Sequence, residues 1–268
     1  TCPANISVTT APGQCFAQVT FPNPTATDNC PGIVISRIGG LASGSTFPVG
    51  VTTEVFVARD NTNNRDTCSF TITVNDGQAP VYTNCPANIT VNSQPGLCGS
   101  AVSWVAPTAT DNCPGLVITS SHTPGSFFNA GTTTVTYIAT DASGNADTCS
   151  FTVTVTDLVP PQITCPGNIS VANDPGLCGA TVNYVTPVGT DNCPGAVTTL
   201  QSGLASGSLF PIGSTSISYT VTDAFGNAAS CSFTVFVSDT EAPVIVGCPA
   251  DTTIPAQTGM CSSPYSWI

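Results

Sequence analysis

The sequence contains no lysine, only three arginines and one histidine, against 15 acidic residues in 268. All three arginines, Arg37, Arg59 and Arg65, lie in the first third of the chain. Nucleic acids and anionic membrane surfaces are bound through stripes of positive charge, so this composition excludes both classes of partner. The single histidine, His122, provides no repeated general base, and no glycine-rich phosphate loop is present, so we expect no enzymatic activity.

Long apolar runs are also absent. No stretch approaches 18 consecutive apolar residues, so we expect no transmembrane helix and no membrane insertion of this segment. Close cysteine pairs of the C-x₂-C kind, which are typical of structural zinc sites, are missing too. No signal peptide precedes the first cysteine and the chain stops within an expected strand, so we expect a piece of a longer protein.

In place of these features, one motif occurs three times. TDNCPG occupies residues 27–32, 110–115 and 190–195, and the 14 cysteines follow the same period. They fall into four registers: a CP cysteine (Cys2, Cys85, Cys165, Cys248), one 13 residues later (Cys15, Cys98, Cys178, Cys261), the TDNC cysteine (Cys30, Cys113, Cys193) and one before SF (Cys68, Cys149, Cys231). Such a period is typical of tandem domains. It predicts modules at residues 1–79, 80–160 and 161–242, and the start of a fourth module at 243–268.

Within each module, apolar and polar residues alternate as in half-buried β-strands. In the first module, residues 15–21 alternate in this way, and so do residues 68–74. No stretch has a helical period of 3.6 residues. Short strands separated by Gly/Pro turns predict an all-β fold with one small immunoglobulin-like β-sandwich per module. The linkers DGQAP and DLVPP are too short and too restricted by proline to behave as free coil, so we expect an elongated array.

The chain contains the segments CPANIT, PTATDNC, GSTFPVGVTTEVFVARD and DASGNADTCSFTVTVTD, with an aspartate and a proline at each module junction. These segments resemble the HYR (hyalin repeat) module, an immunoglobulin-like β-sandwich of extracellular proteins. Copies with four cysteines and TDNCPG are most similar to the long arrays on secreted proteins of Bacteroidota-type bacteria. The resemblance covers essentially the whole chain and implies an extracellular location, secreted or attached to a cell surface, an adhesive or scaffold role, and no catalysis. The first module departs from the pattern at DNTNNRDTC.

The sequence leaves the disulfide connectivity open, because four cysteines per module allow three pairings. In the fold that the resemblance implies, the first and last strands start side by side, and similar animal modules keep only the cysteines at these two positions. This implies Cys2–Cys68, Cys85–Cys149 and Cys165–Cys231, and leaves Cys15–Cys30, Cys98–Cys113 and Cys178–Cys193 as the second set. A rival pairing joins the first cysteine of each module to the second and the third to the fourth.

Aspartates recur in three registers: in TDNC, at the end of the long strand, and at the module junction. Two interpretations stay open. The aspartates form Asx turns that cap backbone N–H groups, or they gather at each junction as hard oxygen ligands for Ca²⁺. The calcium hypothesis uses Asp76, Asp111 and Asp141 at the first junction, and Asp157, Asp191 and Asp223 at the second.

The leading functional hypothesis is a non-enzymatic extracellular segment that forms a stiff stalk or filament on a cell surface. Its partners would be further repeats of the same chain and chains that associate laterally through edge strands. The alternative is a receptor or lectin-like ectodomain that binds a glycan or a protein. The one candidate segment for that role is SHTPGSFFNAG, with His122 and Phe128, although we expect Phe127 to match the core residues Phe47 and Phe210.

Overall fold

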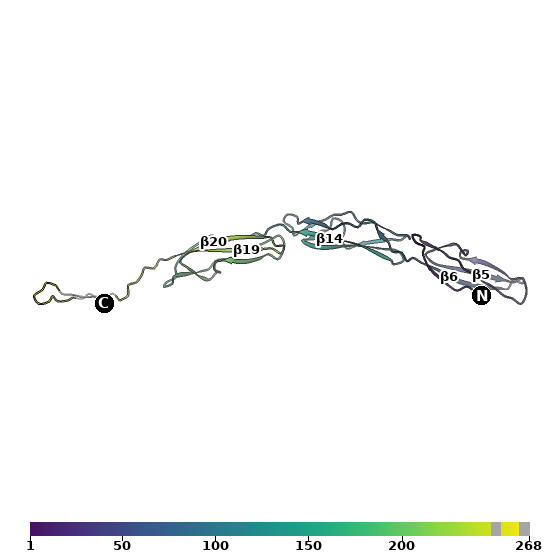
Figure 1. Ribbon diagram of the computed structural model, residues 1–268, viewed down its shortest axis with the longest axis horizontal. Helices are drawn as coiled ribbons and strands as arrows, with labels where there is room; N and C mark the ends of the chain where they lie inside the picture. The colour runs from purple at the N-terminus through teal and green to yellow at the C-terminus, as the bar shows by residue number, and fades with distance from the viewer. Residues whose placement is uncertain (248–252, 263–268) are drawn as a thin grey trace. The chain divides into compact units, whose positions relative to one another are not determined.

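The computed structural model describes residues 1–247 and 253–262, and within these ranges it contains strands and no helix (Figure 1). Consequently, no helix in the described part of the chain is long and apolar enough to cross a bilayer. Contacts divide the chain into two compact units. The first unit comprises Thr1–Val159 and Asn192–Pro194, and the second comprises Pro160–Asp191 and Gly195–Ile268. The first unit holds the first two modules, and the second holds most of the third.

Each module contains a β-sandwich in which a four-stranded sheet packs against a two-stranded sheet. The strands of the first module are β1 (Ile6–Thr9), β2 (Phe16–Gln18), β3 (Val34–Gly39), β4 (Thr46–Pro48), β5 (Gly50–Arg59) and β6 (Arg65–Asn75). The large sheet has the order β1-β6-β5-β3, and the small sheet pairs β2 with β4. Apolar side chains of the two sheets pack together, with Phe47 of β4 fully buried against Phe70 and Ile72 of β6. The all-β sandwich fold is therefore confirmed.

The second and third modules repeat this arrangement. The second contains β7 (Val81–Tyr82), β8 (Ile89–Asn92), β9 (Gly99–Ala101), β10 (Ala109–Thr110), β11 (Val117–Ser120), β12 (Phe127–Asn129), β13 (Gly131–Thr140) and β14 (Ala146–Thr156). The third contains β15 (Ile169–Ala172), β16 (Gly179–Val182), β17 (Val197–Ser202), β18 (Ser208–Pro211), β19 (Gly213–Thr222) and β20 (Ala228–Ser238). Their large sheets are ordered β8-β14-β13-β11 and β15-β20-β19-β17, and their small sheets pair β9 with β12 and β16 with β18. The second module has a further two-stranded sheet, in which β7 pairs with β10. Part of the expected fourth module, including Cys248, lies outside the described residues.

The first strand of each large sheet runs parallel to the last. In the first module, Ile6 pairs with Ile72, and the same register continued four residues back sets Cys2 beside Cys68. The structure contains the disulfides Cys2–Cys68, Cys85–Cys149 and Cys165–Cys231. Each of these disulfides closes a loop of more than 60 residues. On the chain-entropy account, closing a loop of this length stabilises the folded state by about 4 kcal/mol.

One aromatic position of the second module differs from expectation. Phe128, which is 2% exposed, fills the core beside Trp104, whereas Phe127 is 50% exposed. The match of Phe127 to Phe47 is therefore wrong. The ring of Phe127 lies across Gly99 instead, where an added Cβ would come within 2.5 Å of a ring carbon.

The two ends of a module carry different loops. Strand β5 starts at Gly50, which pairs with Val74, and ends at Arg59, which pairs with Arg65. We call the end of each module at the β5–β6 hairpin, or its equivalent, the leading end, and the opposite end the trailing end. The TDNC loop lies at the leading end, where the Asn61 side chain donates a hydrogen bond to the Pro31 carbonyl (3.3 Å).

The turn that carries Cys15 lies at the trailing end. There the N–H of Gly13 donates to Oε1 of Gln78, which follows β6 (2.8 Å). The two loops of the first module that carry its second and third cysteines are thus separated by the length of the sandwich.

Candidate functional site at the junction of the first two modules

The trailing end of the first module is covalently joined to the leading end of the second. A disulfide connects Cys15 to Cys113, whose Cα atoms are 4.8 Å apart. Within the first unit, a second bond of the same kind connects Cys98 to Cys193. Each bond links the turn cysteine of one module to the TDNC cysteine that follows in the next module.

The second set of expected disulfides is therefore wrong. The pairs Cys15–Cys30, Cys98–Cys113 and Cys178–Cys193 do not form, and Cys30 and Cys178 are free and exposed. The physical reason is that the turn cysteine and the TDNC cysteine of one module lie at opposite ends of the sandwich. A disulfide requires Cα atoms within roughly 4.4–6.8 Å of each other. The rival pairing is wrong as well, because Cys2 bonds Cys68 rather than Cys15.

The trailing turn of the first module is held by the linker residue Gln78. Its Oε1 accepts the Gly13 N–H, and its Nε2 donates to Thr10 Oγ1 and to the Ala11 carbonyl (3.2 Å each). Gly13 has a φ of +71°, which glycine adopts without steric cost. This turn presents the sulfur of Cys15 and the carbonyl of Gln14 to the second module.

The TDNC loop of the second module contributes two further contacts. The Asp111 carboxylate accepts the N–H of Cys113 (2.8 Å), an Asx turn that shapes the loop. The side-chain amide of Asn112 donates to the Gln14 carbonyl and to Oδ1 of Asp76, both at 3.1 Å. The three central residues of the motif thus have separate tasks: a turn, a hydrogen-bond bridge and a covalent bond.

The loop after β13 adds another bridge through Asn145. Its side-chain Nδ2 donates to the Asp76 carbonyl (3.0 Å) and to Asp141 Oδ2 (2.8 Å). Burial disfavours the charged form of Asp141, but hydrogen bonds from the Asn145 side chain and from the N–H groups of Asn145 and Ser143 outweigh it. The pKa of Asp141 is therefore below its usual value. The carboxylate accepts hydrogen bonds from Ser143 and Asn145 of its own loop.

Two carboxylates converge at this junction. Potential ligand atoms of Asp76, Asp111 and Cys113 lie within 4.8 Å of one another, and Asp141 is not in this group. The sulfur of Cys113 is oxidised in a disulfide, which leaves the two carboxylates. Asp76 is 7% exposed, and its Oδ2 and the Oδ1 of Asp111 are buried without a hydrogen-bond partner.

Part of the pattern recurs within the first unit. The side chain of Asn192 donates to the Leu97 carbonyl (3.2 Å) and to Oδ1 of Asp157 (3.4 Å). In the second unit, Asp223 forms the same Asx loop as Asp141, with the N–H groups of Phe225 and Asn227 as donors. Asp157 belongs to the first unit while Asp191 and Asp223 belong to the second, so a metal site shared by these three remains a prediction from the sequence.

The bridging asparagines were not identified from the sequence as contact residues. Their signal was present, since an asparagine follows the aspartate in every TDNC motif and another closes the loop after the long strand. An amide can donate to a carbonyl and to a carboxylate at once, which suits a junction rich in acceptors.

We expect Asn112→Asp to loosen the junction, because a carboxylate cannot donate to Gln14 or Asp76 and adds a negative charge beside Asp76. The free energy of local opening should fall by about 1–3 kcal/mol. Hydrogen exchange of peptides spanning residues 10–16 and 110–116 would measure it. The control is Asn29→Asp, the same motif position in the first module, whose backbone N–H bonds only Asp28. Equal exchange in the two variants would contradict the bridging role.

Comparisons with known proteins agree on the type of module. A family model described as "HYR domain" matches residues 1–74, 75–155 and 156–237. Hyalin from Lytechinus variegatus is 39% identical over 236 residues, which cover 85% of this chain and 44% of that protein. Hyalin from Strongylocentrotus purpuratus is 37% identical and is matched over 83% of this chain and 19% of that protein. The chain thus spans less than half the length of these relatives.

Two more distant similarities were found. A serine-rich adhesin for platelets from Staphylococcus aureus (strain MRSA252) is 32% identical over 158 residues, which cover 49% of this chain and 11% of that protein. Among solved structures, Drosophila N-cadherin EC1-3 is 14% identical with a TM-score of 0.36, and the match covers 89% of this chain and 99% of that chain.

Proposed function

Because the chain belongs to the HYR domain family, we propose that it is a segment of a non-enzymatic extracellular adhesion protein, in which its modules serve as a stiff stalk or filament on a cell surface. Disulfide bonds persist in oxidising compartments outside the cytosol, so the five disulfides within the described residues support an extracellular location. The match to an adhesin for platelets supports an adhesive role. The same proposal includes that the chain belongs to one of the long module arrays on secreted proteins of Bacteroidota-type bacteria.

The disulfide pattern is the observation that carries the stalk role. A pulling force that enters near Cys2 passes through the bond to Cys68, crosses a linker to Cys85, and continues through Cys149. From Cys2 to Cys231 this covalent path includes only about 33 linker residues, or roughly 115 Å at full extension, against roughly 800 Å for the whole backbone. Force therefore cannot draw out the sandwiches, and the junction bonds hold neighbouring modules in place.

Single-molecule force spectroscopy tests this role. The oxidised chain should extend without long unfolding steps, since most residues lie inside closed loops. Chemical reduction should reveal three long steps, each roughly 230 Å for the 66 or so residues that the CP–SF bond encloses. The variant Cys2→Ser, Cys15→Ser, Cys68→Ser, Cys113→Ser should show one such step. Long steps in the oxidised, unmutated chain would refute the stalk role.

We further propose that the first junction binds Ca²⁺ through Asp76 and Asp111. A carboxylate oxygen of Asp76 and one of Asp111 lie within 4.8 Å of each other, and each carboxylate has one buried oxygen without a hydrogen-bond partner. Two carboxylates this close repel unless a cation or a proton joins them. The second module contains no lysine or arginine that could neutralise them. Hard carboxylate oxygens suit Ca²⁺, and a site with only two carboxylates fits the weak affinities of extracellular modules, with dissociation constants on the order of 10⁻⁴–10⁻³ M.

Calcium should therefore raise the melting temperature of the first unit, with a stabilisation of about 1.4 kcal/mol at a tenfold excess over the dissociation constant. Asp111→Asn should abolish the shift, because it removes one charged ligand but keeps an oxygen that can accept from Cys113. Asp28→Asn, at the exposed equivalent position, should leave the shift unchanged. Isothermal titration that gives no heat with the unmutated chain would show that these aspartates only form turns.

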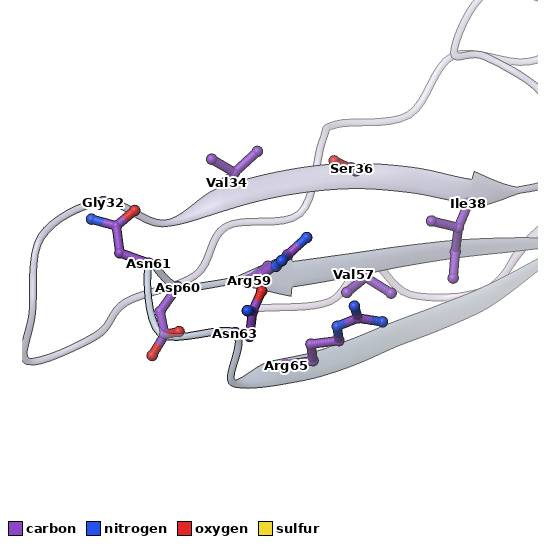
Figure 2. Close-up of a pocket in the computed structure, with 10 residues that line it drawn as sticks. All are labelled: Gly32, Val34, Ser36, Ile38, Val57, Arg59, Asp60, Asn61, Asn63 and Arg65. Carbon is purple, nitrogen blue, oxygen red and sulfur yellow. The ribbon is translucent and has the colours of Figure 1, made fainter.

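A second candidate function, glycan recognition, is favoured by a surface cavity on the first module. The cavity measures about 570 Å³ and is lined by Arg59 and Arg65 and by Asp60, Asn61 and Asn63 of the loop between them (Figure 2). Arg59 and Arg65 are direct cross-strand partners, a like-charge pair that destabilises a sheet. An anionic ligand would relieve this repulsion, and guanidinium groups match carboxylate and sulfate geometry.

Binding of a sulfated or carboxylated oligosaccharide should depend on this pair. A glycan array followed by titration of the best ligand would detect it, and rising salt should weaken it. Arg59→Gln together with Arg65→Gln should remove binding, while Arg37→Gln, an arginine outside this cavity, should not. If the chain retains no anionic glycan in any of these assays, the receptor alternative is excluded for this surface.

A further inference from the structure

The cluster at the first junction contains a sulfur as well as two carboxylates. Potential ligand atoms of Asp76, Asp111 and Cys113 lie within 4.8 Å of one another. In the oxidised chain the Cys113 sulfur is bonded to the sulfur of Cys15, so it is not available to a metal. Reduction of this one bond releases two thiolates at a place where two carboxylates already converge. The junction then has a different set of metal ligands.

Each of the two carboxylates has one oxygen held by hydrogen bonds and one oxygen without a partner. Oδ1 of Asp76 accepts three hydrogen bonds, from the Asn112 side-chain amide (3.1 Å), the Gln78 N–H (3.2 Å) and the Thr10 hydroxyl (3.3 Å). Oδ2 of Asp76, a residue that is 7% exposed, is buried without a partner. In Asp111, Oδ2 accepts the Cys113 N–H, and Oδ1 is buried without a partner. Hydrogen bonds of this kind orient carboxylates that bind metals.

The side chain of Asn112 relates the sulfur to one of the carboxylates. Its Nδ2 donates to Asp76 Oδ1 at 3.1 Å and lies 3.4 Å from the sulfur of Cys113. One amide thus contacts both a carboxylate and the sulfur. These contacts do not involve Cys15, so they do not depend on the disulfide.

The chemistry of the ligands selects the metal. Zn²⁺ binds cysteine thiolates at about 2.3 Å and aspartate oxygens at about 2.0–2.2 Å, in four-coordinate sites. Two ligand atoms of one zinc ion are therefore at most roughly 4.6 Å apart. The three ligand atoms of the cluster already lie within 4.8 Å of one another. Ca²⁺ takes oxygen ligands, so a released thiolate favours zinc over calcium.

We propose that reduction of the Cys15–Cys113 disulfide converts the first junction into a zinc site, with Asp76, Asp111 and the Cys113 thiolate as ligands and the Cys15 thiolate as the fourth. The zinc site shares its two carboxylates with the calcium site proposed above, but it does not depend on calcium binding. The two cysteines are 98 residues apart in the sequence, so this site has no C-x₂-C spacing.

The reduced state occurs in the life of every chain. Cysteines are made as thiols, and disulfides form and persist only in an oxidising compartment. Zinc therefore joins the first two modules before the disulfide forms, and again when a reductant opens the bond. The same junction is closed by a covalent bond in one redox state and by a metal in the other.

Opening of the bond requires a reductant, for which a low-molecular-weight thiol such as glutathione suffices. A glutathione thiolate attacks one sulfur of the Cys15–Cys113 bond, which releases one cysteine thiolate and leaves a mixed disulfide. A second glutathione thiolate attacks the glutathione sulfur of that mixed disulfide and releases the other cysteine thiolate. One protein disulfide is reduced to two thiolates, which bind Zn²⁺, and two glutathione thiols are oxidised to one glutathione disulfide.

A variant that cannot form the bond tests the site while the rest of the chain stays oxidised. Cys15→Ser frees the Cys113 thiol beside Asp76 and Asp111. The matched control, Cys113→Ser, frees the Cys15 thiol, which is not in the group of three ligand atoms. In both variants of the full chain, serine also replaces the cysteines outside the described disulfides: Cys30, Cys178, Cys248 and Cys261.

We expect Cys15→Ser to bind one Zn²⁺, and Cys113→Ser to bind it at least about a hundredfold more weakly, because losing a ligand costs more than losing one of its supporting hydrogen bonds, which costs roughly 10–100-fold. Competition with a chromophoric zinc chelator measures both affinities. X-ray absorption at the zinc edge should show sulfur at about 2.3 Å in Cys15→Ser. Equal affinities, or a zinc shell without sulfur, would overturn the proposal.

The unmutated chain gives an independent measurement in a glutathione redox buffer. Zinc at a hundredfold excess over its dissociation constant should raise the ratio of dithiol to disulfide for Cys15 and Cys113 about a hundredfold, since it binds only the reduced state. Acid quenching, alkylation and mass spectrometry measure this ratio. Cys85–Cys149 is the internal control, because it belongs to no group of three metal-ligating side chains among the described residues.

An unchanged ratio for Cys15 and Cys113, or an equal change for Cys85 and Cys149, would contradict a zinc site at this junction. The calcium proposal is tested on the oxidised chain and the zinc proposal on the freed thiols. A failure of one is therefore distinguishable from a failure of the other.

Discussion

The parallel pairing of the first and last strands is the constraint on which the rest of this structure depends. It sets Cys2 beside Cys68 at the leading end, and it also makes β1 finish where β6 finishes, at the trailing end. The turn after β1 must then lie next to the linker that leaves the module. Gln78 of that linker accepts a hydrogen bond from the turn, and Cys15 faces the next module, where it bonds Cys113. In a sandwich with an antiparallel first strand, the same turn would face backwards and the junction could not be closed by a disulfide.

The junction assigns different tasks to aspartate and asparagine, although the two side chains have nearly the same shape. Asp111 and Asp141 accept backbone N–H groups and shape their own loops. Asn112 and Asn145 donate to acceptors of the preceding module. This division follows from the surroundings, because turn carbonyls and the carboxylate of Asp76 need donors, and a carboxylate provides none.

Much of the fold follows from the sequence because it depends on local patterns. Alternation of apolar residues identified the long strands, and the parity of Cys68, Phe70 and Ile72 agrees with their shared face. Phe127 was misassigned because a glycine-rich loop of variable length precedes β12, and parity cannot be followed across it. Counting back from the glycine that opens the long strand (Gly50, Gly131, Gly213) identifies Phe47, Phe128 and Phe210 as equivalents.

The junction disulfides could not be read from spacing, because a cysteine register repeats in every module. Within one chain, Cys15 has the same sequence relation to Cys30 as Cys98 has to Cys113, and a partner one period further along preserves the register equally well. Only the end of the sandwich at which each loop emerges distinguishes the two choices. The end at which a loop emerges depends on the direction of the strands beside it, and the period of the sequence alone does not give that direction.

The overlap of the five disulfide loops has a consequence for a protein exposed to proteases. The loops 2–68, 15–113, 85–149, 98–193 and 165–231 together cover every peptide bond from Cys2 to Cys231. With bonds confined to single modules, a single cut in either linker would release one part of the chain from the other. Here a single cut anywhere in that range leaves both fragments covalently attached. A piece of that range is released only when two cuts fall on either side of a segment that contains no disulfide-bonded cysteine.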